Sequence, residues 1–346
     1  MSWAFSDQRR LNNNSRGDAI ITSLVFMVIS ISSIAPKLKP PFPWFGGKSR
    51  VAPLVWQHFG DTKNYVEPFA GSLATVLLRP GYAPFRHTET VNDLDCYLAN
   101  FWRAVQLDPA SVAYWCDSPV NEADLSARHL WLVNQSEFRE RMKTDPDYFD
   151  PKIAGWWAWG LCAWIGSGWC KLSTIPRQLP HLGDAGQGVH RQLPHLGDAG
   201  QGESDIYEYF EALANRLRRV RVCCGDWRRV LGSSPTEKIG VTGIFLDPPY
   251  ADTAKREKDL YAQDSLTVAH EVREWAIANG QNPKLRIALC GYEGEHLMPS
   301  DWDCIPWKAA GGYAGQKRGK SNINGTKERI WFSPHCLLGN AIEVAA

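Results

Sequence analysis

Short apolar runs alternate with longer amphipathic segments along most of the chain from about residue 36 onwards. An unbroken or alternating apolar run favours a strand, and apolar residues three and four apart favour a helix. On this basis we predict strands at 64–66, 220–224, 244–246, 285–290 and 329–333, and a further strand that ends at Val91. We predict helices at 51–59, 73–78, 96–106, 206–218 and 268–278. Strands that alternate with helices predict an α/β fold built around a largely parallel sheet.

Residues from about 108 to 202 interrupt this alternation. The segment is rich in tryptophan, and the stretch 177–188 recurs unchanged at 191–202. Two copies are too few for a solenoid, and their glycine, proline and polar content favours surface loops. We therefore predict that 108–202 is a module inserted into the α/β domain, with its tryptophans as the core of the insert.

Residues 1–35 differ from the rest of the chain. Arg9, Arg10 and Arg16 precede an apolar stretch at 19–35, an order typical of the charged and hydrophobic regions of a signal peptide. Serine and threonine dilute this stretch, and it is short for a membrane span. We interpret residues 1–35 as an extension outside the functional fold, and an N-terminal membrane anchor is the alternative.

Charge and cysteine content indicate the cellular compartment of the protein but not its function. The formal net charge of the 346 residues is +1, which neither supports nor excludes a nucleic-acid partner. The nine cysteines are an odd number without Cys-x-x-Cys spacing, which argues against both a disulfide framework and a zinc site. We therefore expect no bound metal, no membrane partner and a reducing, cytoplasmic compartment.

The tetrapeptide Asp247-Pro248-Pro249-Tyr250 directly follows the apolar run 241–246. Because proline cannot continue a strand, the run stops in a rigid turn at its carboxyl end, where open α/β sheets bind ligands. The turn offers a carboxylate and backbone carbonyls that can accept both N–H bonds of a planar exocyclic amine, and a ring that can stack on a base. The alternative is a strand-terminating turn with an exposed tyrosine.

Three further elements occupy positions where such a sheet can bind a nucleotide. The strand at 64–66 runs into Glu67-Pro68-Phe69-Ala70-Gly71, a glycine loop of a kind found beside cofactors. Asp93 lies 22 residues beyond Gly71, near the offset of an acid that binds a ribose, although it can also cap the following helix. Lys48 ends a proline-aromatic-Gly-Gly-Lys approach, and by itself it is typical of a solvated surface lysine.

Three stretches, Trp44-Phe45-Gly46-Gly47-Lys48, Glu67-Pro68-Phe69-Ala70-Gly71 and Asp247-Pro248-Pro249-Tyr250, together resemble the Dam-like N6-adenine DNA methyltransferases. The resemblance covers most of residues 40–335, and the order of the motifs looks like the α arrangement of that family. It implies a Rossmann-like methyltransferase sheet with helices on both faces, formed by 36–107 and 203–336, and an inserted target-recognition domain at 108–202. It also implies methyl transfer from S-adenosylmethionine to N6 of a flipped adenine at a specific short site in duplex DNA.

The same resemblance implies roles for individual residues. The residues that would hold the target base are Asp247, Pro248 and Tyr250. The residues that would bind the methyl donor are Trp44, Lys48, Glu67, Phe69, Gly71, Asp93, Asp226 and Asp247. In this set Asp93 would take the ribose hydroxyls, and Asp226 would lie near the donor's adenine. The loop departs from the family pattern at Leu73, where a second glycine is usual.

Two segments are candidates for contacts with DNA. The basic residues Lys317, Arg318 and Lys320 of the glycine-rich tail either contact phosphates or belong to a solvated loop. In the duplicated stretch, the Arg-Gln pairs at 177–178 and 191–192 either read base edges or belong to a flexible loop. A cognate restriction enzyme is a possible partner, and no stable protein partner is implied.

Other functions are compatible with parts of this pattern. The alternatives are N6-adenine methylation of RNA, amide methylation of a protein glutamine, and a catalytically silent DNA-binding relative. Asp247 favours adenine, since asparagine there would favour amide or smaller-amine acceptors and serine would favour N4 of cytosine. Joint retention of Asp247, Tyr250, Lys48 and Asp93 argues against a silent relative.

Overall fold

The computed structural model describes residues 38–44, 46–119, 121–164, 168–171, 206–250, 267–308 and 327–337. All of them lie in the second of two compact units, Lys37–Ala346. Three predictions fall outside the described residues: the extension 1–35, the duplicated stretch 177–202, and the basic residues Lys317, Arg318 and Lys320.

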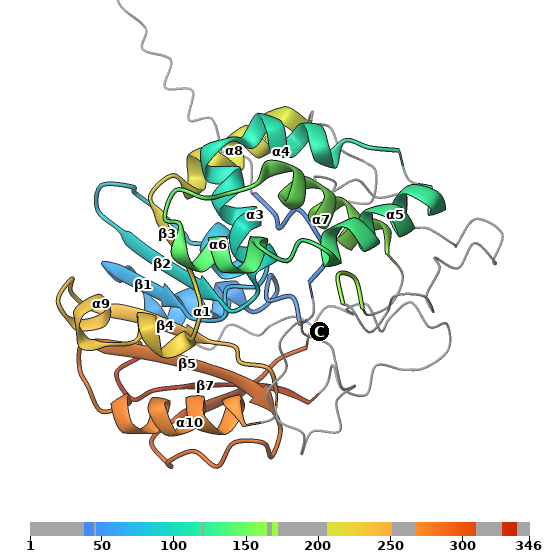
Figure 1. The fold of residues 1–346 in the computed structure, drawn as a ribbon. Coiled ribbons are helices and arrows are strands. Elements are labelled where there is room, and N and C mark those ends of the chain that lie inside the picture. Colours follow the sequence, from blue (N-terminus) through green and yellow to red (C-terminus); the bar gives the residue numbers. More distant parts are fainter. Residues whose placement is uncertain are drawn as a thin grey trace, which may run out of the picture. The chain divides into compact units, whose positions relative to one another are not determined.

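A seven-stranded sheet with the order β3-β2-β1-β4-β5-β7-β6 forms the centre of this unit (Figure 1). The strands are β1 (Asn64–Glu67), β2 (Thr88–Asp93), β3 (Val220–Cys224), β4 (Thr242–Leu246), β5 (Leu285–Tyr292), β6 (Asp303–Pro306) and β7 (Glu328–Phe332). Strands β1 to β5 are parallel, and β7 runs antiparallel to both β5 and β6. The predicted strands all occur, with ends within two residues of those expected. The sequence does not predict the short edge strand β6.

The five predicted helices all occur, and the structure adds further helices that were not predicted individually. The described helices are α1 (Ala52–Phe59), α2 (Ala74–Leu77), α3 (Cys96–Leu107), α4 (Pro109–Cys116), α5 (Glu122–Val133), α6 (Phe138–Thr144), α7 (Pro151–Ala163), α8 (Ile206–Leu217), α9 (Ser233–Glu237) and α10 (Val268–Asn279), with a 3-10 turn η2 (Trp227–Val230). Side-chain caps begin several of them, since Asp95, Asp108, Asn121 and Asp150 each accept a hydrogen bond from a backbone N–H of the first turn.

Side chains along the central strands alternate between two hydrophobic cores, one on each face of the sheet. Tyr65 and Phe245 belong to the core shared with α1, α3, α4, α7 and α8. Val66 and Ile244 belong to the core formed with η2 and α10. Helices therefore cover both faces, β1 and β4 are buried along their whole length, and the predicted Rossmann-like α/β sheet is confirmed.

Among the described helices of the predicted insert, α4, α6 and α7 pack onto α3 or α8, and α5 packs onto α7. The ring centre of Trp157 lies 5.2 Å from that of Phe42 and 5.9 Å from that of Phe101, and Trp159 and Trp164 are also buried. These tryptophans are core residues, as expected, but the core is continuous with that of the sheet. Target recognition by residues 108–202 stays a prediction.

No helix within the described ranges combines the length and the apolar character needed to cross a membrane.

Candidate active site

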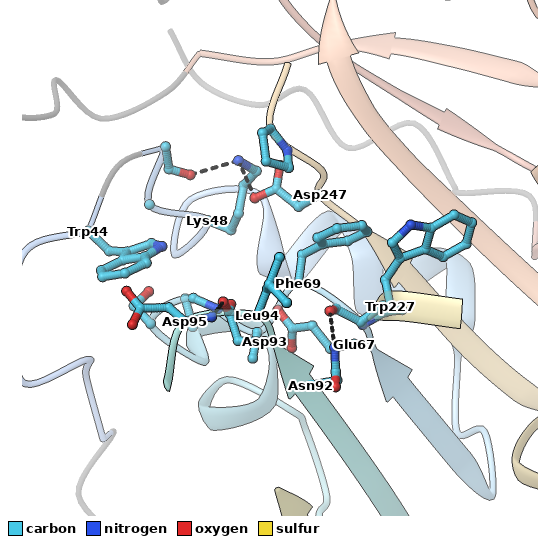
Figure 2. A pocket seen from close by; sticks show the side chains of 18 of the residues that line it. Trp44, Lys48, Glu67, Phe69, Asn92, Asp93, Leu94, Asp95, Trp227 and Asp247 are labelled. Atoms are coloured by element: carbon cyan, nitrogen blue, oxygen red, sulfur yellow. Dashed lines mark hydrogen bonds and ion pairs between the residues drawn. The ribbon is translucent and has the colours of Figure 1, made fainter. Parts of the chain in front are cut away.

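One cavity lies at the carboxyl ends of β1, β2, β3 and β4, the edge at which the sequence predicts ligand binding (Figure 2). The segments that follow these four strands line it, together with the approach that contains Trp44 and Lys48 and with part of α7. The eight predicted donor-binding residues all line this cavity: Trp44, Lys48, Glu67, Phe69, Gly71, Asp93, Asp226 and Asp247. Their assignment to a donor stays a prediction, but the fold does bring them together.

The glycine loop after β1 is held in place by hydrogen bonds to its backbone. Gly71 N–H donates to Asp93 Oδ2 over 3.2 Å, and its carbonyl accepts from Trp102 Nε1 over 3.1 Å. Its φ of +47° is a left-handed value, and a Cβ at this position would lie 2.6 Å from Trp44 Nε1. A side chain at position 71 would therefore be strained and would collide with the wall of the cavity.

Leu73, the departure from the family pattern, adopts the backbone conformation that a glycine would favour. Its φ is +57° and its ψ is +23°, a left-handed conformation that costs an L-residue roughly 1–2 kcal/mol. Its side chain is fully buried in the hydrophobic core, while Ser72 and Ala74 line the cavity. The substitution therefore places strain in the backbone rather than a side chain in the cavity.

Asp93 stands at the end of β2 with its carboxylate fixed by the backbone. Oδ2 accepts from Gly71 N–H and Oδ1 accepts from Asp95 N–H over 3.0 Å. Burial raises the pKa of Asp93 to about 7, against the opposing effect of these hydrogen bonds. The alternative interpretation of Asp93 as a helix cap is wrong, because Asp95 is the residue that caps α3, accepting from Tyr97 N–H over 2.8 Å.

Lys48 and Asp247 form a buried ion pair. Lys48 Nζ lies 2.8 Å from Asp247 Oδ2 and donates to the carbonyl of Gly46 over 2.7 Å. Burial alone would lower the pKa of Lys48, but Asp247, Cys290 and Glu328 outweigh it and raise that pKa, so the side chain stays charged. Burial raises the pKa of Asp247, and Lys48 opposes the rise. The alternative of a solvated surface lysine is wrong, since Lys48 is 6% exposed.

The tyrosine of the Asp-Pro-Pro-Tyr turn is anchored rather than exposed. Tyr250 Oη donates to Glu328 Oε2 over 2.6 Å, and its ring centre lies 4.5 Å from that of Tyr292 in a T-shaped arrangement. Lys48 Nζ lies 5.7 Å from the centre of the same ring. The alternative of a strand-terminating turn with an exposed tyrosine is therefore wrong.

The walls of the cavity carry an excess of acidic side chains. Among the described residues, five carboxyl groups line it: Glu67, Asp93, Asp95, Asp226 and Asp247. The cations among these lining residues are Lys48 and Lys171. Burial raises the pKa of Glu67 well above its usual range, although Tyr65 Oη donates to it over 2.9 Å. Because a bound cation would favour the ionised forms of these buried carboxyl groups, the site suits a ligand with positive charge.

Sequence reasoning missed several residues of the site. Leu94 lines the cavity although it is 41% exposed, and an apolar residue directly after a strand-end acid is a signal that could have identified it. Trp227 follows Asp226 and lies with its ring centre 6.2 Å from that of Phe69. The lining residues from the predicted insert, Trp157, Leu161, Gly168, Trp169 and Lys171, carry no local signal. Among the described residues, no group of three or more His, Cys, Asp or Glu is arranged to hold a metal.

Comparison with known proteins agrees with the motifs. Residues 44–151 match the family model of the D12 class N6 adenine-specific DNA methyltransferases. No curated protein matches the chain. The matched segment begins at Trp44 and includes Lys48, the glycine loop and Asp93. The chain therefore contains, at residues 44–151, a segment similar to the D12 class N6 adenine-specific DNA methyltransferases, which agrees with the Dam-like resemblance of its motifs.

Proposed function

We propose that this protein transfers a methyl group from S-adenosylmethionine to N6 of a flipped adenine at a specific short site in double-stranded DNA. The observation that carries the proposal is the convergence of the Gly71 loop, Asp93 and the Lys48–Asp247 pair on one cavity at the carboxyl edge of the sheet. A glycine loop and an acid serve the donor, and the turn beside them serves the acceptor, so that donor and acceptor meet at Asp247.

The cavity suits the methyl donor in shape and charge. Trp44 lies toward one end of it, where the methionine part would bind, and Phe69 and Trp227 lie toward the other, where the adenine would bind (Figure 2). Asp93 stands between them at the position expected for the ribose. The excess of carboxyl groups complements a cationic sulfonium. When bound, S-adenosylmethionine supplies an already activated methyl group, so the reaction requires neither a metal nor a covalent enzyme nucleophile.

The Asp-Pro-Pro-Tyr turn would orient the acceptor amine. The N6 amine is a poor nucleophile, because its lone pair is delocalised into the ring. We assign Asp247 and the Pro248 carbonyl as acceptors of its two N–H bonds, which favours a pyramidal nitrogen whose lone pair faces the methyl group. Lys48 holds Asp247 through Oδ2 and favours its ionised form, so that positioning and electrostatics supply the rate.

The acceptor base has to leave the double helix before it can reach Asp247. A base inside a stacked duplex is inaccessible to an enzyme that acts on its ring edge, so the adenine must be flipped out. Tyr250 would stack on the flipped adenine, a contact worth roughly 1–3 kcal/mol. We assign target recognition to residues 108–202 and contacts with DNA phosphates to Lys317, Arg318 and Lys320. The cytoplasm remains the compartment that we expect.

The proposal is tested with labelled donor, mixed duplex DNA and RNA, followed by nucleoside analysis. We expect label in N6-methyladenine of duplex DNA, and a fall of about 10²–10³-fold in Asp247→Asn. Asparagine is preferable to alanine here, because its amide oxygen can still accept a hydrogen bond from the buried Lys48, whereas alanine would remove both the charge and the acceptor. Asp301→Asn, an exposed change away from the cavity, is the matched control. Wild-type turnover by Asp247→Asn, or label in cytosine, in RNA alone or in protein, would contradict the proposal.

A further inference from the structure

Glu328 is a buried carboxyl group at the start of β7 for which the sequence suggests no role. It is 4% exposed, and its Oε2 accepts the hydroxyl hydrogen of Tyr250 over 2.6 Å. A buried carboxyl group is costly unless it is hydrogen-bonded or paired, so its partner is informative. That partner is the ring to which we assign stacking on the target base.

The anchor of Tyr250 belongs to a rigid part of the sheet. Glu328 lies directly opposite Tyr292 in the antiparallel β5–β7 pair. Tyr292 packs its ring against Tyr250 with an interplanar angle of 70°. Two neighbouring strand residues thus hold Tyr250: Glu328 binds the Tyr250 hydroxyl, and Tyr292 packs against the Tyr250 ring. Because the strands are hydrogen-bonded to each other, the ring has little freedom to tilt.

The fixed ring adjoins the reacting groups. Lys48 Nζ lies 5.7 Å from the centre of the Tyr250 ring and 2.8 Å from Asp247 Oδ2. A tilt of the ring would therefore move a stacked base relative to the carboxylate that orients its amine. Burial raises the pKa of Tyr250 well above its usual range, so the hydroxyl keeps the proton with which it holds Glu328.

We infer that Glu328 is a positioning residue: it fixes the orientation of Tyr250, and through it the orientation of the flipped adenine at Asp247. This inference rests on the proposed function. A competing explanation is electrostatic, since Glu328 also acts on the charge of Lys48. The two explanations differ in whether the effect of Glu328 passes through the Tyr250 hydroxyl.

The test is a double-mutant cycle between positions 328 and 250, measured as kcat/KM for duplex DNA with wild-type activity established first. Glu328→Leu removes the acceptor, Glu328→Gln keeps an acceptor oxygen without charge, and Tyr250→Phe removes the donor. We expect Glu328→Leu and Tyr250→Phe each to lower kcat/KM about tenfold, with no further loss in the double variant. Glu328→Gln should stay within about threefold of wild type, since a neutral acceptor still holds the hydroxyl.

Two further measurements separate positioning from damage to the fold or to the donor site. The Kd for S-adenosylmethionine should be unchanged in all variants. The fluorescence of 2-aminopurine, placed at the mapped target adenine of a duplex, should change in parallel in Glu328→Leu and Tyr250→Phe. If Glu328→Leu does not fold, Glu328→Gln and Tyr250→Phe still give the comparison.

Three results would overturn the inference. The first is that Glu328→Leu lowers kcat/KM by the same factor whether or not Tyr250→Phe is also present. The second is a loss of kcat/KM in Glu328→Gln as large as in Glu328→Leu. The third is full activity of Tyr250→Phe. Absence of N6-methyladenine from the wild-type reaction would instead refute the proposed function, so the two failures are distinguishable.

Discussion

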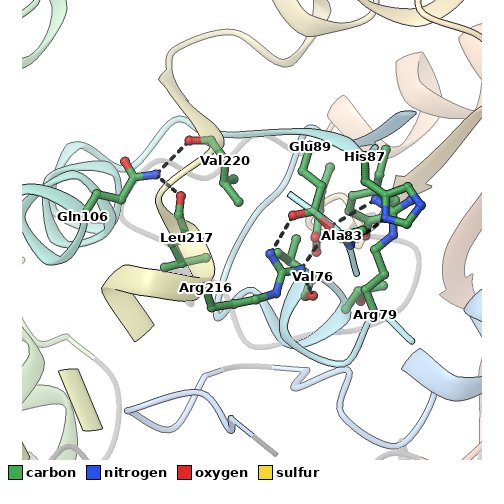
Figure 3. A network of polar contacts seen from close by, with 12 residues as sticks. Val76, Arg79, Ala83, His87, Glu89, Gln106, Arg216, Leu217 and Val220 are labelled. Carbon is green, nitrogen blue, oxygen red and sulfur yellow. Dashed lines mark hydrogen bonds and ion pairs between the residues drawn. The ribbon is translucent and has the colours of Figure 1, made fainter. Parts of the chain in front are cut away.

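Two buried charge clusters lie at opposite ends of the central strands. The edge cluster, Arg79, Glu89 and Arg216, stands near the start of β2 (Figure 3). The cavity cluster, Lys48, Glu67, Asp247 and Glu328, stands beside the cavity. Both clusters hold ionisable groups away from water, but they differ in their numbers of acidic and basic groups and in whether they border the cavity.

The edge cluster is closed upon itself. Arg79 Nη1 lies 3.2 Å from Glu89 Oε1, and Arg216 Nη1 and Nη2 lie 2.8 Å and 3.0 Å from Oε2 and Oε1. The guanidinium groups also donate to the carbonyls of Thr62 and Val76. This cluster ties the end of α2 to β2 and α8, and it does not border the cavity. Arginine stays protonated in proteins, so both guanidinium groups keep their positive charge. Within this cluster, the Glu89 carboxylate is the group that offsets that charge.

The cavity cluster has more carboxyl groups than cations. Burial raises the pKa of Glu67, Asp247 and Glu328, which Lys48 opposes in each case. Carboxyl groups can take up a proton when no cation is near and release it when one arrives, and arginines cannot do the reverse. Buried charge therefore serves stability where a carboxylate and backbone carbonyls hold the cations together, and serves binding where acid is left in excess beside a cavity.

The largest effect that we expect on stability comes from Glu89→Gln. It leaves two buried arginines without their carboxylate, which should lower the free energy of unfolding by about 3–5 kcal/mol. Urea unfolding measures the loss, and methyl transfer per folded molecule should be retained. Glu211→Gln, an exposed change on α8, is the control and should stay within about 0.5 kcal/mol. Unchanged stability with lost methyl transfer would contradict the assignment of this cluster to stability.

Glycine substitutions at two left-handed positions sharpen the contrast further. Gly71 has a φ of +47° beside Trp44, and Gly81 has a φ of +59° with no atom within 4 Å of an added Cβ. Both alanine variants should lose about 1 kcal/mol of stability from backbone strain, and Gly71→Ala should lose more because its Cβ would collide with Trp44. Only Gly71→Ala should also weaken binding of S-adenosylmethionine, by about tenfold or more, in calorimetric titration. Equal donor affinities in the two variants would remove Gly71 from the donor site.

The smallest expected effect is a pH dependence of donor binding through Asp93. Its pKa of about 7 means that the ionised fraction, which accepts from ribose hydroxyls, rises from about a tenth at pH 6 to about nine tenths at pH 8. Donor affinity should therefore rise with pH by less than tenfold, and this slope should be absent from Asp93→Asn. An identical slope in both proteins would contradict the assignment.

The raised pKa of Asp93 also predicts how the stability of the protein changes with pH. In the folded protein the Asp93 carboxyl group keeps its proton up to a pH of about 7, whereas in the unfolded chain it releases the proton near its ordinary pKa of 3.8. The contribution of Asp93 to stability is therefore full below pH 3.8 and is lost as the pH rises to about 7. Thermal unfolding of wild type and Asp93→Asn across this window measures the difference.

Local patterns were sufficient for much of the fold. Buried strands such as β4 read as apolar runs, and Pro248 and Pro249 mark where that strand stops, because these signals depend on a few consecutive residues. The helices of the predicted insert were not predicted one by one. Their tryptophans pack against residues such as Phe42 and Phe101, which are distant in the sequence.

The α/β class, the order of the motifs and the strand ends at which Gly71, Asp93 and Asp247 stand could all be predicted from local sequence patterns. The partners of these side chains became known only from the way in which the strands and helices pack. This packing paired Lys48 with Asp247, gave the cap of α3 to Asp95, and joined Tyr250 to Glu328, 78 residues later. The reason is physical: backbone periodicity and turn chemistry act over a few residues, whereas the partner of a buried side chain depends on which strands and helices pack side by side.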